Sequence, residues 1–119
     1  MLNDIKRNLL FGKVVKDLPH EAKLLLYTAI EVADPSGLFD ASYPLDVYAL
    51  PLTALTALEN AGLLLYFRDE NVAAIVHWNI IANQFQRGKG TLFPEVKSRL
   101  AVKNGKYSVK DSISSDTAA

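Results

Sequence analysis

The sequence predicts a mainly helical α+β domain that contains one β-hairpin. Three features support this class: a helical apolar repeat over residues 22–33, two strand-like runs at Leu63–Phe67 and Val72–Trp78, and a polar turn of four residues between those runs. The chain has 119 residues, half of them apolar, which suffices for one buried core but not for two. We therefore expect one domain over residues 1–110, followed at 111–119 by a disordered tail or the start of a linker.

The first half of the chain is expected to contain one long helix. Residues 5–16 fit either a short strand or the entry to a helix. The long helix begins at Leu18-Pro19-His20-Glu21, because Pro suits a first turn and Glu complements the positive end of the helix dipole. The turn sequence Asp34-Pro35-Ser36-Gly37 ends it, and Leu38-Phe39 fits a very short strand. The apolar face of this helix consists of Ala22, Leu25, Leu26, Ala29, Ile30 and Ala33.

Two shorter helices are expected next. The first covers residues 42–49, with Ser42 as a candidate cap and Pro44 in its first turn. The second begins at Pro51 and runs to Ala61, with Gly62 as its left-handed stop. We expect its buried side to consist of Leu52, Leu55 and Leu58, and its polar side of Thr53, Thr56, Glu59 and Asn60.

The strand at Leu63–Phe67 carries large apolar side chains on both of its faces. Its second face must therefore be covered, either by another part of the chain or by a partner that includes a second copy. After the return strand, residues 79–86 fit a short helix and Gly88–Gly90 a basic loop. We expect a last helix over residues 95–102 that ends at Asn104-Gly105.

This order of elements is that of a winged helix-turn-helix fold. The helices at 42–49 and 51–61 would form the helix-turn-helix pair, and the hairpin would be the wing. The recognition helix would then present Thr53, Thr56 and Asn60 to DNA. This face has no cation, and Glu59 would repel phosphates, so the usual docking mode in the major groove is disfavoured.

Charge is balanced overall but not along the chain. Residues 17–86 hold two cations against nine acids, whereas residues 1–16 hold four cations and one acid, and residues 87–110 hold seven cations and one acid. Because cations neutralise phosphates, the basic flanks are the candidate contact for double- or single-stranded DNA. The alternative interpretation of the 87–110 segment is a solvated basic tail. Phe85 and Phe93 fit either stacking on DNA bases or burial in the core. The candidate contact residues are Arg87, Lys89, Lys97, Arg99, Lys103 and Lys106.

No catalytic, metal or cofactor site is predicted. The chain has no Cys and only two His, which excludes disulfides, thiolate chemistry and a Cys/His zinc site. The stretch Gly88-Lys89-Gly90-Thr91 lacks the upstream Gly of a phosphate-binding loop. No apolar run approaches the roughly 20 residues of a membrane helix, and we expect no signal peptide, because the apolar pieces of residues 1–12 are short and interrupted by a charge pair. We expect a cytoplasmic protein that is not an enzyme and has no membrane partner.

Four sequence blocks resemble the N-terminal winged-helix domain of phage replisome organisers, the replication initiators of prophages in Gram-positive bacteria. The first three blocks are Leu18–Tyr27, the turn Ala33–Gly37 and the helix end Leu58–Leu63. The fourth and most specific is Val76-His77-Trp78, followed by a basic loop and Thr91–Glu95. The chain departs from the family in its shortened Asp-rich turn, in its Gly-rich basic loop and in its end at residue 119.

The resemblance implies a role in starting phage or prophage DNA replication, in which the protein binds DNA and recruits the helicase-loading machinery of the host cell. It supplies no catalytic residues. Two alternatives use the same scaffold: a protein-interaction module, which docks a helicase loader or forms a homodimer through its hairpin, and a phage transcription regulator. Salt dependence distinguishes them, because phosphate-driven binding weakens steeply with salt.

Overall fold

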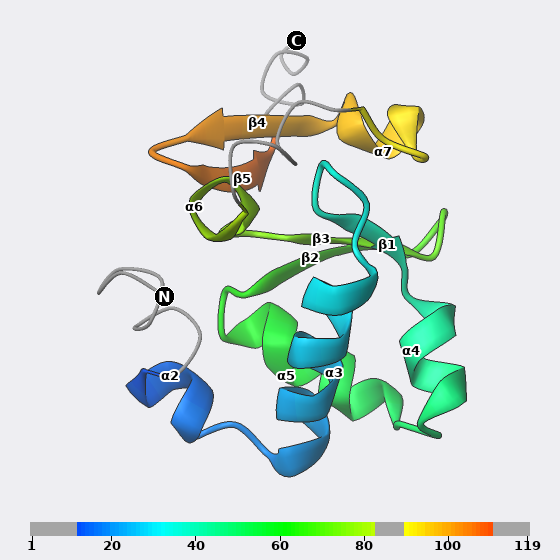
Figure 1. Ribbon diagram of the computed structural model, residues 1–119, viewed down its shortest axis with the longest axis vertical. Helices are drawn as coiled ribbons and strands as arrows, with labels where there is room; N and C mark the ends of the chain where they lie inside the picture. Colours follow the sequence, from blue (N-terminus) through cyan, green and yellow to red (C-terminus); the bar gives the residue numbers. More distant parts are fainter. Residues whose placement is uncertain (1–11, 83–89, 111–119) are drawn as a thin grey trace, which may run out of the picture.

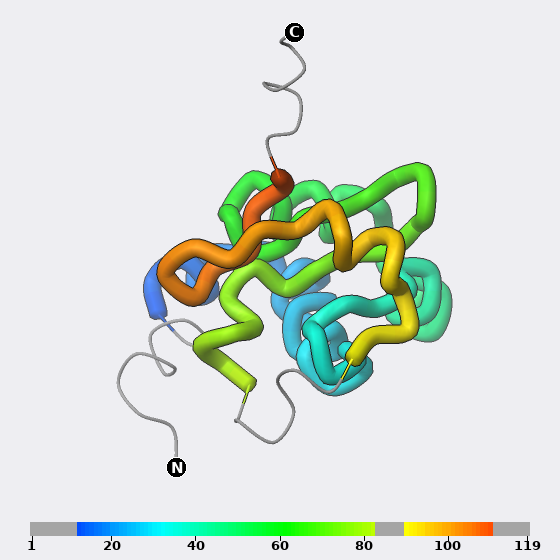
Figure 2. Tube along the Cα trace, turned by 90° about the horizontal axis from the view of Figure 1, so that it is seen from above, coloured from blue at the N-terminus to red at the C-terminus, as the bar shows by residue number. Residues whose placement is uncertain are grey.

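The computed structural model describes residues 12–82 and 90–110 (Figure 1). In this part of the chain, a small three-stranded antiparallel sheet lies between a group of helices on one side and a two-stranded hairpin on the other. The α+β class expected from the sequence is confirmed. Figure 2 views the same arrangement from the side of the hairpin, which crosses above the sheet.

The helices match most of the expected positions. The buried face of α3 holds Ala22, Leu25, Leu26 and Ala29, as the apolar repeat predicts. Three of the helices, α2, α6 and α7, are single turns, and α7 lies beside the two-stranded hairpin and not among the larger helices (Figure 1). The bounds are α2 (Lys13–Lys16), α3 (His20–Val32), α4 (Ser42–Val47), α5 (Leu52–Asn60), α6 (Trp78–Ile81) and α7 (Pro94–Lys97).

Helix α5 packs against α3 and β2, but one expected core residue is exposed. Its buried stripe consists of Ala54, Leu55 and Leu58, whereas Leu52 is 65% exposed. At about 100° per residue, Leu52 lies well off that stripe, so the expectation that it belongs to the core was wrong. The helix ends as predicted, because Gly62 has a φ of +77° and permits the left-handed turn.

The sheet consists of β1 (Leu38–Asp40), β2 (Leu64–Phe67) and β3 (Val72–Ile75), in the order β1-β3-β2. All four residues of the central strand β3 are buried. In β2, Leu64 and Phe67 are buried and the other two side chains pack half-buried against the core. The chain itself therefore covers most of both faces of the strand, and Leu65 remains half-buried.

Two expectations for the second half of the chain were wrong. The return strand ends at Ile75, and Trp78 opens α6 instead of closing the strand. The helix expected over 95–102 lasts only to Lys97, after which β4 (Leu100–Lys103) and β5 (Lys106–Val109) form a second hairpin. Asn104 and Gly105, with φ of +56° and +81°, make its two-residue turn, which is typical of a tight hairpin and not of a helix end.

Candidate functional site: a basic hairpin and the groove beside it

The β4–β5 hairpin is the most basic part of the described chain. Residues 96–110 contain five cations and no acid. Lys103 and Lys106 lie directly opposite each other at the tip of the hairpin, and both are exposed. Like charges opposite each other destabilise a strand pair, so this arrangement weakens the hairpin. The two lysines are therefore candidates for contact with a ligand and do not serve to stabilise the fold.

The outer face of the hairpin presents cations at both of its ends. Side chains alternate between the two faces of a strand, so Lys103 and Lys106 share a face with Ala101 and Ser108. The Lys110 N–H donates to the Arg99 carbonyl at 2.7 Å and extends the pairing by one step. A strip about 13 Å long, at 3.3 Å per residue, therefore runs from the Lys103–Lys106 pair past two small residues to Lys110.

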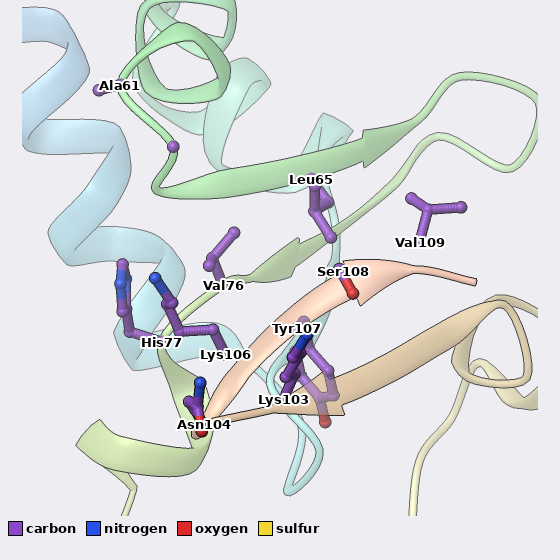
Figure 3. Close-up of a pocket in the computed structure, with 11 residues that line it drawn as sticks. Ala61, Leu65, Val76, His77, Lys103, Asn104, Lys106, Tyr107, Ser108 and Val109 are labelled. Carbon is purple, nitrogen blue, oxygen red and sulfur yellow. The ribbon is translucent and has the colours of Figure 1, made fainter. Parts of the chain in front are cut away.

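A groove of about 720 Å³ runs beside the hairpin, between β5 and the sheet (Figure 3). Its apolar lining includes Leu65, Val76 and Val109, and its polar lining includes His77, Lys103 and Lys106. No Asp or Glu lines it. Such a groove suits a ligand that carries both an apolar part and a negative charge. The complete lining is Ala61, Gly62, Leu65, Val76, His77, Lys103, Asn104, Lys106, Tyr107, Ser108 and Val109.

His77 connects the groove to the charge of the hairpin. It precedes α6, is half-buried, and lies beside the Lys106 side chain in Figure 3. Burial lowers the pKa of His77 below its usual 6.5, and the positive charge of Lys106 lowers it further. A bound anion would partly offset that charge and raise the pKa of His77.

Tyr107 fixes the hairpin to the rest of the fold. Its N–H donates to the Val76 carbonyl at 2.8 Å, and its hydroxyl donates to the Ser36 carbonyl at 2.8 Å. Burial raises the pKa of the Tyr107 hydroxyl. Gly105 lies so close to Ile80 that an added Cβ would come within 2.7 Å of that side chain. The tip of the hairpin is therefore held against α6 in a defined position.

The turn that contains Asp34 positions the segment that leads into α7. The carboxylate of this buried residue accepts the Ser36 and Leu38 N–H groups on one oxygen, and the Thr91 hydroxyl and Leu92 N–H on the other. The Trp78 indole N–H donates to the Pro35 carbonyl at 2.9 Å. The second and fourth of the sequence blocks that carry the family resemblance thus contact each other, and their residues support the fold instead of forming the basic surface.

Of the six cations predicted to contact DNA, the four that the structure describes do not form one cluster. Lys103 and Lys106 lie together at the hairpin tip, and Lys97 lies on α7 beyond the other end of the hairpin. Arg87 and Lys89 lie outside the described residues, as do Phe85 and the tail at 111–119. His77 and Lys110 were not among the contact residues predicted from the sequence. The Asn104-Gly105 dipeptide, interpreted as a hairpin turn, would have placed Lys110 across from Arg99, whereas no local signal places His77 beside Lys106.

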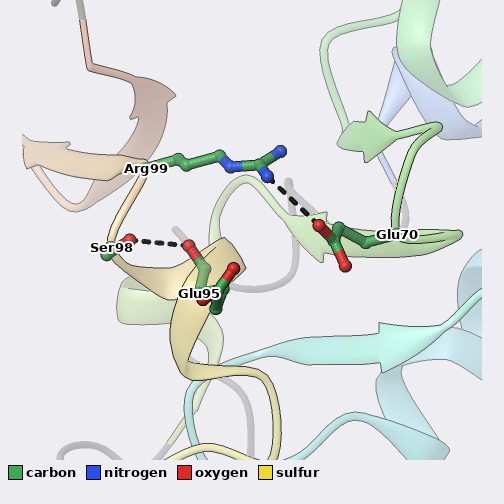
Figure 4. Close-up of polar contacts among 4 residues, drawn as sticks. All are labelled: Glu70, Glu95, Ser98 and Arg99. Carbon is green, nitrogen blue, oxygen red and sulfur yellow. Dashed lines mark hydrogen bonds and ion pairs between the residues drawn. The ribbon is translucent and has the colours of Figure 1, made fainter.

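Within the described part of the chain, Arg99 has side-chain partners and the two tip lysines have none. Its Nη2 lies 3.2 Å from Glu70 Oε2 in the β2–β3 turn (Figure 4), and its guanidinium stacks 5.6 Å from the centroid of the Phe67 ring. The neighbouring Ser98 hydroxyl donates to the Glu95 carbonyl at 2.6 Å. Arg99 therefore braces the hairpin against the sheet, and less of its charge is available to a ligand.

The other predicted contact surfaces carry little positive charge. Thr53, Thr56 and Asn60 are exposed on α5, as expected, but residues 24–67 contain no Lys, Arg or His. In the N-terminal flank, Lys13 bonds to Asp17 at 2.9 Å, and α2 lies at the opposite end of the long axis from the hairpin (Figure 1). The described parts of the two basic flanks therefore do not combine into one surface.

No protein-family model, curated protein or solved structure matches this chain. Within residues 12–82 and 90–110, no group of three or more His, Asp or Glu side chains is placed to hold a metal ion. In the same ranges, none of the helices has the length and apolar character needed to cross a bilayer.

Proposed function

We propose that this chain is a DNA-binding module that acts in the initiation of phage or prophage DNA replication, without catalytic activity of its own. The observation that carries the DNA-binding part is the pair of Lys103 and Lys106 at the tip of an acid-free hairpin, where neither ammonium group has an ion-pair partner among the described residues. The role in replication is proposed from the four sequence blocks that resemble phage replisome organisers. Recruitment of a host helicase loader belongs to the same proposal.

We propose a winged helix-turn-helix framework for the domain. The order α3, β1, α4, α5, β2 and β3, together with the sheet order β1-β3-β2, supports this assignment. In that framework α5 takes the place of the recognition helix. Its lack of cations argues that the β4–β5 hairpin, an addition after the wing, supplies the phosphate contacts instead.

The dimensions of the hairpin fit a nucleic-acid backbone. Phosphates are spaced about 3.4 Å apart along the axis for each strand of B-DNA, so a strip about 13 Å long spans several of them. Lys103 and Lys106 at one end and Lys110 at the other can each contact a phosphate. The apolar part of the adjacent groove adds room for an unstacked base, which favours a single-stranded or distorted duplex ligand.

Fluorescence anisotropy with labelled double- and single-stranded DNA, measured from about 50 to about 200 mM salt, tests the proposal. The decisive variant is Lys103→Glu with Lys106→Glu. Its matched control is Lys13→Glu with Lys16→Glu, which makes the same change in charge on exposed residues at the far end of the molecule.

We expect the wild-type chain to bind with micromolar affinity at low salt. The hairpin variant should lose at least about tenfold in affinity, and its log–log salt slope should shrink by about 2, one for each phosphate contact removed. The α2 control should stay within about threefold of wild type. If wild type fails to bind either DNA at low salt, or if both double variants weaken binding equally, the hairpin assignment is wrong.

A further inference from the structure

A second surface of the molecule combines exposed apolar side chains with negative charge. Tyr43, Val47 and Tyr48 on and next to α4 are 56%, 55% and 48% exposed. They line a shallow groove of about 260 Å³ between α3 and α4, which Glu31 also lines. Asp46 is exposed on the same short helix. We call these five residues the acidic patch.

The acidic patch lies in a stretch of chain without any positive charge. Residues 24–67 contain five acids and no Lys, Arg or His. One of the five, Asp34, is buried in its turn, whereas Asp40 just before α4 and Asp46 on it are exposed. Exposed Tyr and Val rimmed by charge of one sign are typical of a protein-interaction surface.

The groove beside the β4–β5 hairpin has the complementary character. It is lined by Leu65, Val76 and Val109, with His77, Lys103 and Lys106 as its charged groups and no acid. Its volume of about 720 Å³ leaves room for projecting aromatic side chains. Figures 1 and 2 place α4 and the hairpin tip on opposite sides of the molecule.

We propose that the acidic patch of one copy docks against the basic groove of a second copy, so that the protein associates head to tail. Tyr43 and Tyr48 of one molecule enter the groove, and Asp46 and Glu31 face Lys103 and Lys106 of the other. Contact between two identical faces would oppose acids to acids or lysines to lysines, which is unfavourable. The net charge of zero means that no overall repulsion opposes the approach.

A head-to-tail contact leaves one patch and one groove free at the two ends of each assembly. The assembly therefore grows with concentration instead of stopping at a dimer. Because the contact pairs exposed charges, it weakens as salt rises. Head-to-tail association does not require DNA. DNA and a second copy of the chain would nevertheless both contact Lys103 and Lys106.

Sedimentation velocity of the full chain over a range of concentrations, at about 50 and about 300 mM salt, tests the proposal. The groove variant is Lys103→Glu with Lys106→Glu, and the patch variant is Tyr43→Ser with Tyr48→Ser. All four residues are exposed, so the fold should tolerate both variants, which circular dichroism checks. The control is Lys13→Glu with Lys16→Glu on α2.

The wild-type chain and the α2 control should show a mass that rises with concentration at low salt. Each of the two surface variants should lose at least about tenfold in association constant. An equimolar mixture of the groove and patch variants should form a dimer and nothing larger, because each contributes one intact surface. The patch variant should keep its affinity for DNA, which separates this proposal from the DNA-binding one.

Three results would overturn the head-to-tail contact. The first is a wild-type chain that stays monomeric at low salt and near-millimolar concentration. The second is a groove variant that still self-associates alone, since that would show a symmetric contact. The third is a mixture that stays monomeric while the wild-type chain associates.

Discussion

Replacing Asp34 tests how one buried carboxylate connects two segments of the chain. Its Oδ1 accepts the N–H groups of Ser36 and Leu38 at 2.8 and 3.1 Å, within its own turn. Its Oδ2 accepts the Thr91 hydroxyl at 2.5 Å and the Leu92 N–H at 3.0 Å, from a segment more than 50 residues away. Two variants separate these roles: Asp34→Ala removes both sets of bonds, and Asp34→Asn keeps one oxygen for the turn.

The surroundings of the donors set the expected magnitudes. Ser36 and Leu38 are buried, and each buried N–H left without a partner costs about 1 to 3 kcal/mol, so Asp34→Ala should destabilise the fold by about 3 to 4 kcal/mol. Leu92 is 80% exposed, so water can replace the bond to its N–H. Asp34→Asn, with its oxygen facing the turn, should therefore cost only about 1 kcal/mol.

Urea denaturation followed by circular dichroism measures the two free energies of unfolding, and hydrogen exchange with mass spectrometry locates the change. In Asp34→Asn, exchange should increase mainly around residues 91–97, with little effect on α3. In Asp34→Ala, exchange should also increase across the turn and β1. If Asp34→Ala lowers the free energy of unfolding by less than about 1 kcal/mol, or if both variants lower it equally, the two sets of hydrogen bonds do not have these separate roles.

Three further predictions concern Gly37 in the turn after α3, His77 in the groove beside the β4–β5 hairpin, and Arg99, which contacts the sheet. Gly37→Ala should destabilise the fold by at least about 3 kcal/mol, because the φ of Gly37 is +86° and the new Cβ would lie 2.3 Å from the buried indole of Trp78. The control Gly62→Ala, at a φ of +77° with nothing within 4 Å of the new Cβ, should cost only about 1 kcal/mol. Equal losses of stability in thermal denaturation of the two variants would contradict the clash with the indole. The pKa of His77 is lowered in the fold, so the unfolded chain binds more protons and stability should fall as the pH drops below about 6.5. NMR titration should find that pKa raised in Lys106→Gln, and an unchanged value would exclude the lysine as a cause. Arg99→Gln should lower the free energy of unfolding by about 1 kcal/mol, because it removes the contacts to Glu70 and Phe67. The salt slope of DNA binding should change less than half as much as it does in the Lys103→Glu, Lys106→Glu variant. A larger change would place Arg99 among the phosphate contacts.

The elements that were predicted correctly have signals that are local in the sequence. The apolar repeat of α3 and the strand pair around the turn at residues 68–71 each depend on neighbours within about a dozen positions. Gly62 marks the end of α5 because only a left-handed residue fits there without strain. Backbone geometry and side-chain spacing set such patterns, so the helices and strands that they encode can be predicted without knowledge of the fold.

The candidate site needed the tertiary structure. Pro94 and Glu95 are true helix-start signals, but the helix lasts one turn because the following residues gain more from pairing with β5 and from burying Leu100 and Tyr107. That gain depends on the Val76 carbonyl, which is far from the hairpin in sequence.

The separation of the predicted cations also depends on contacts that no local pattern contains. The sequence by itself determined that residues 87–110 are basic and that α5 has no cation. The tertiary structure decided that Arg99 is engaged by Glu70, that Lys103 and Lys106 meet at a hairpin tip, and that His77 joins them. Composition sets the total charge of a segment, whereas strand register and long-range packing decide which charges share a surface.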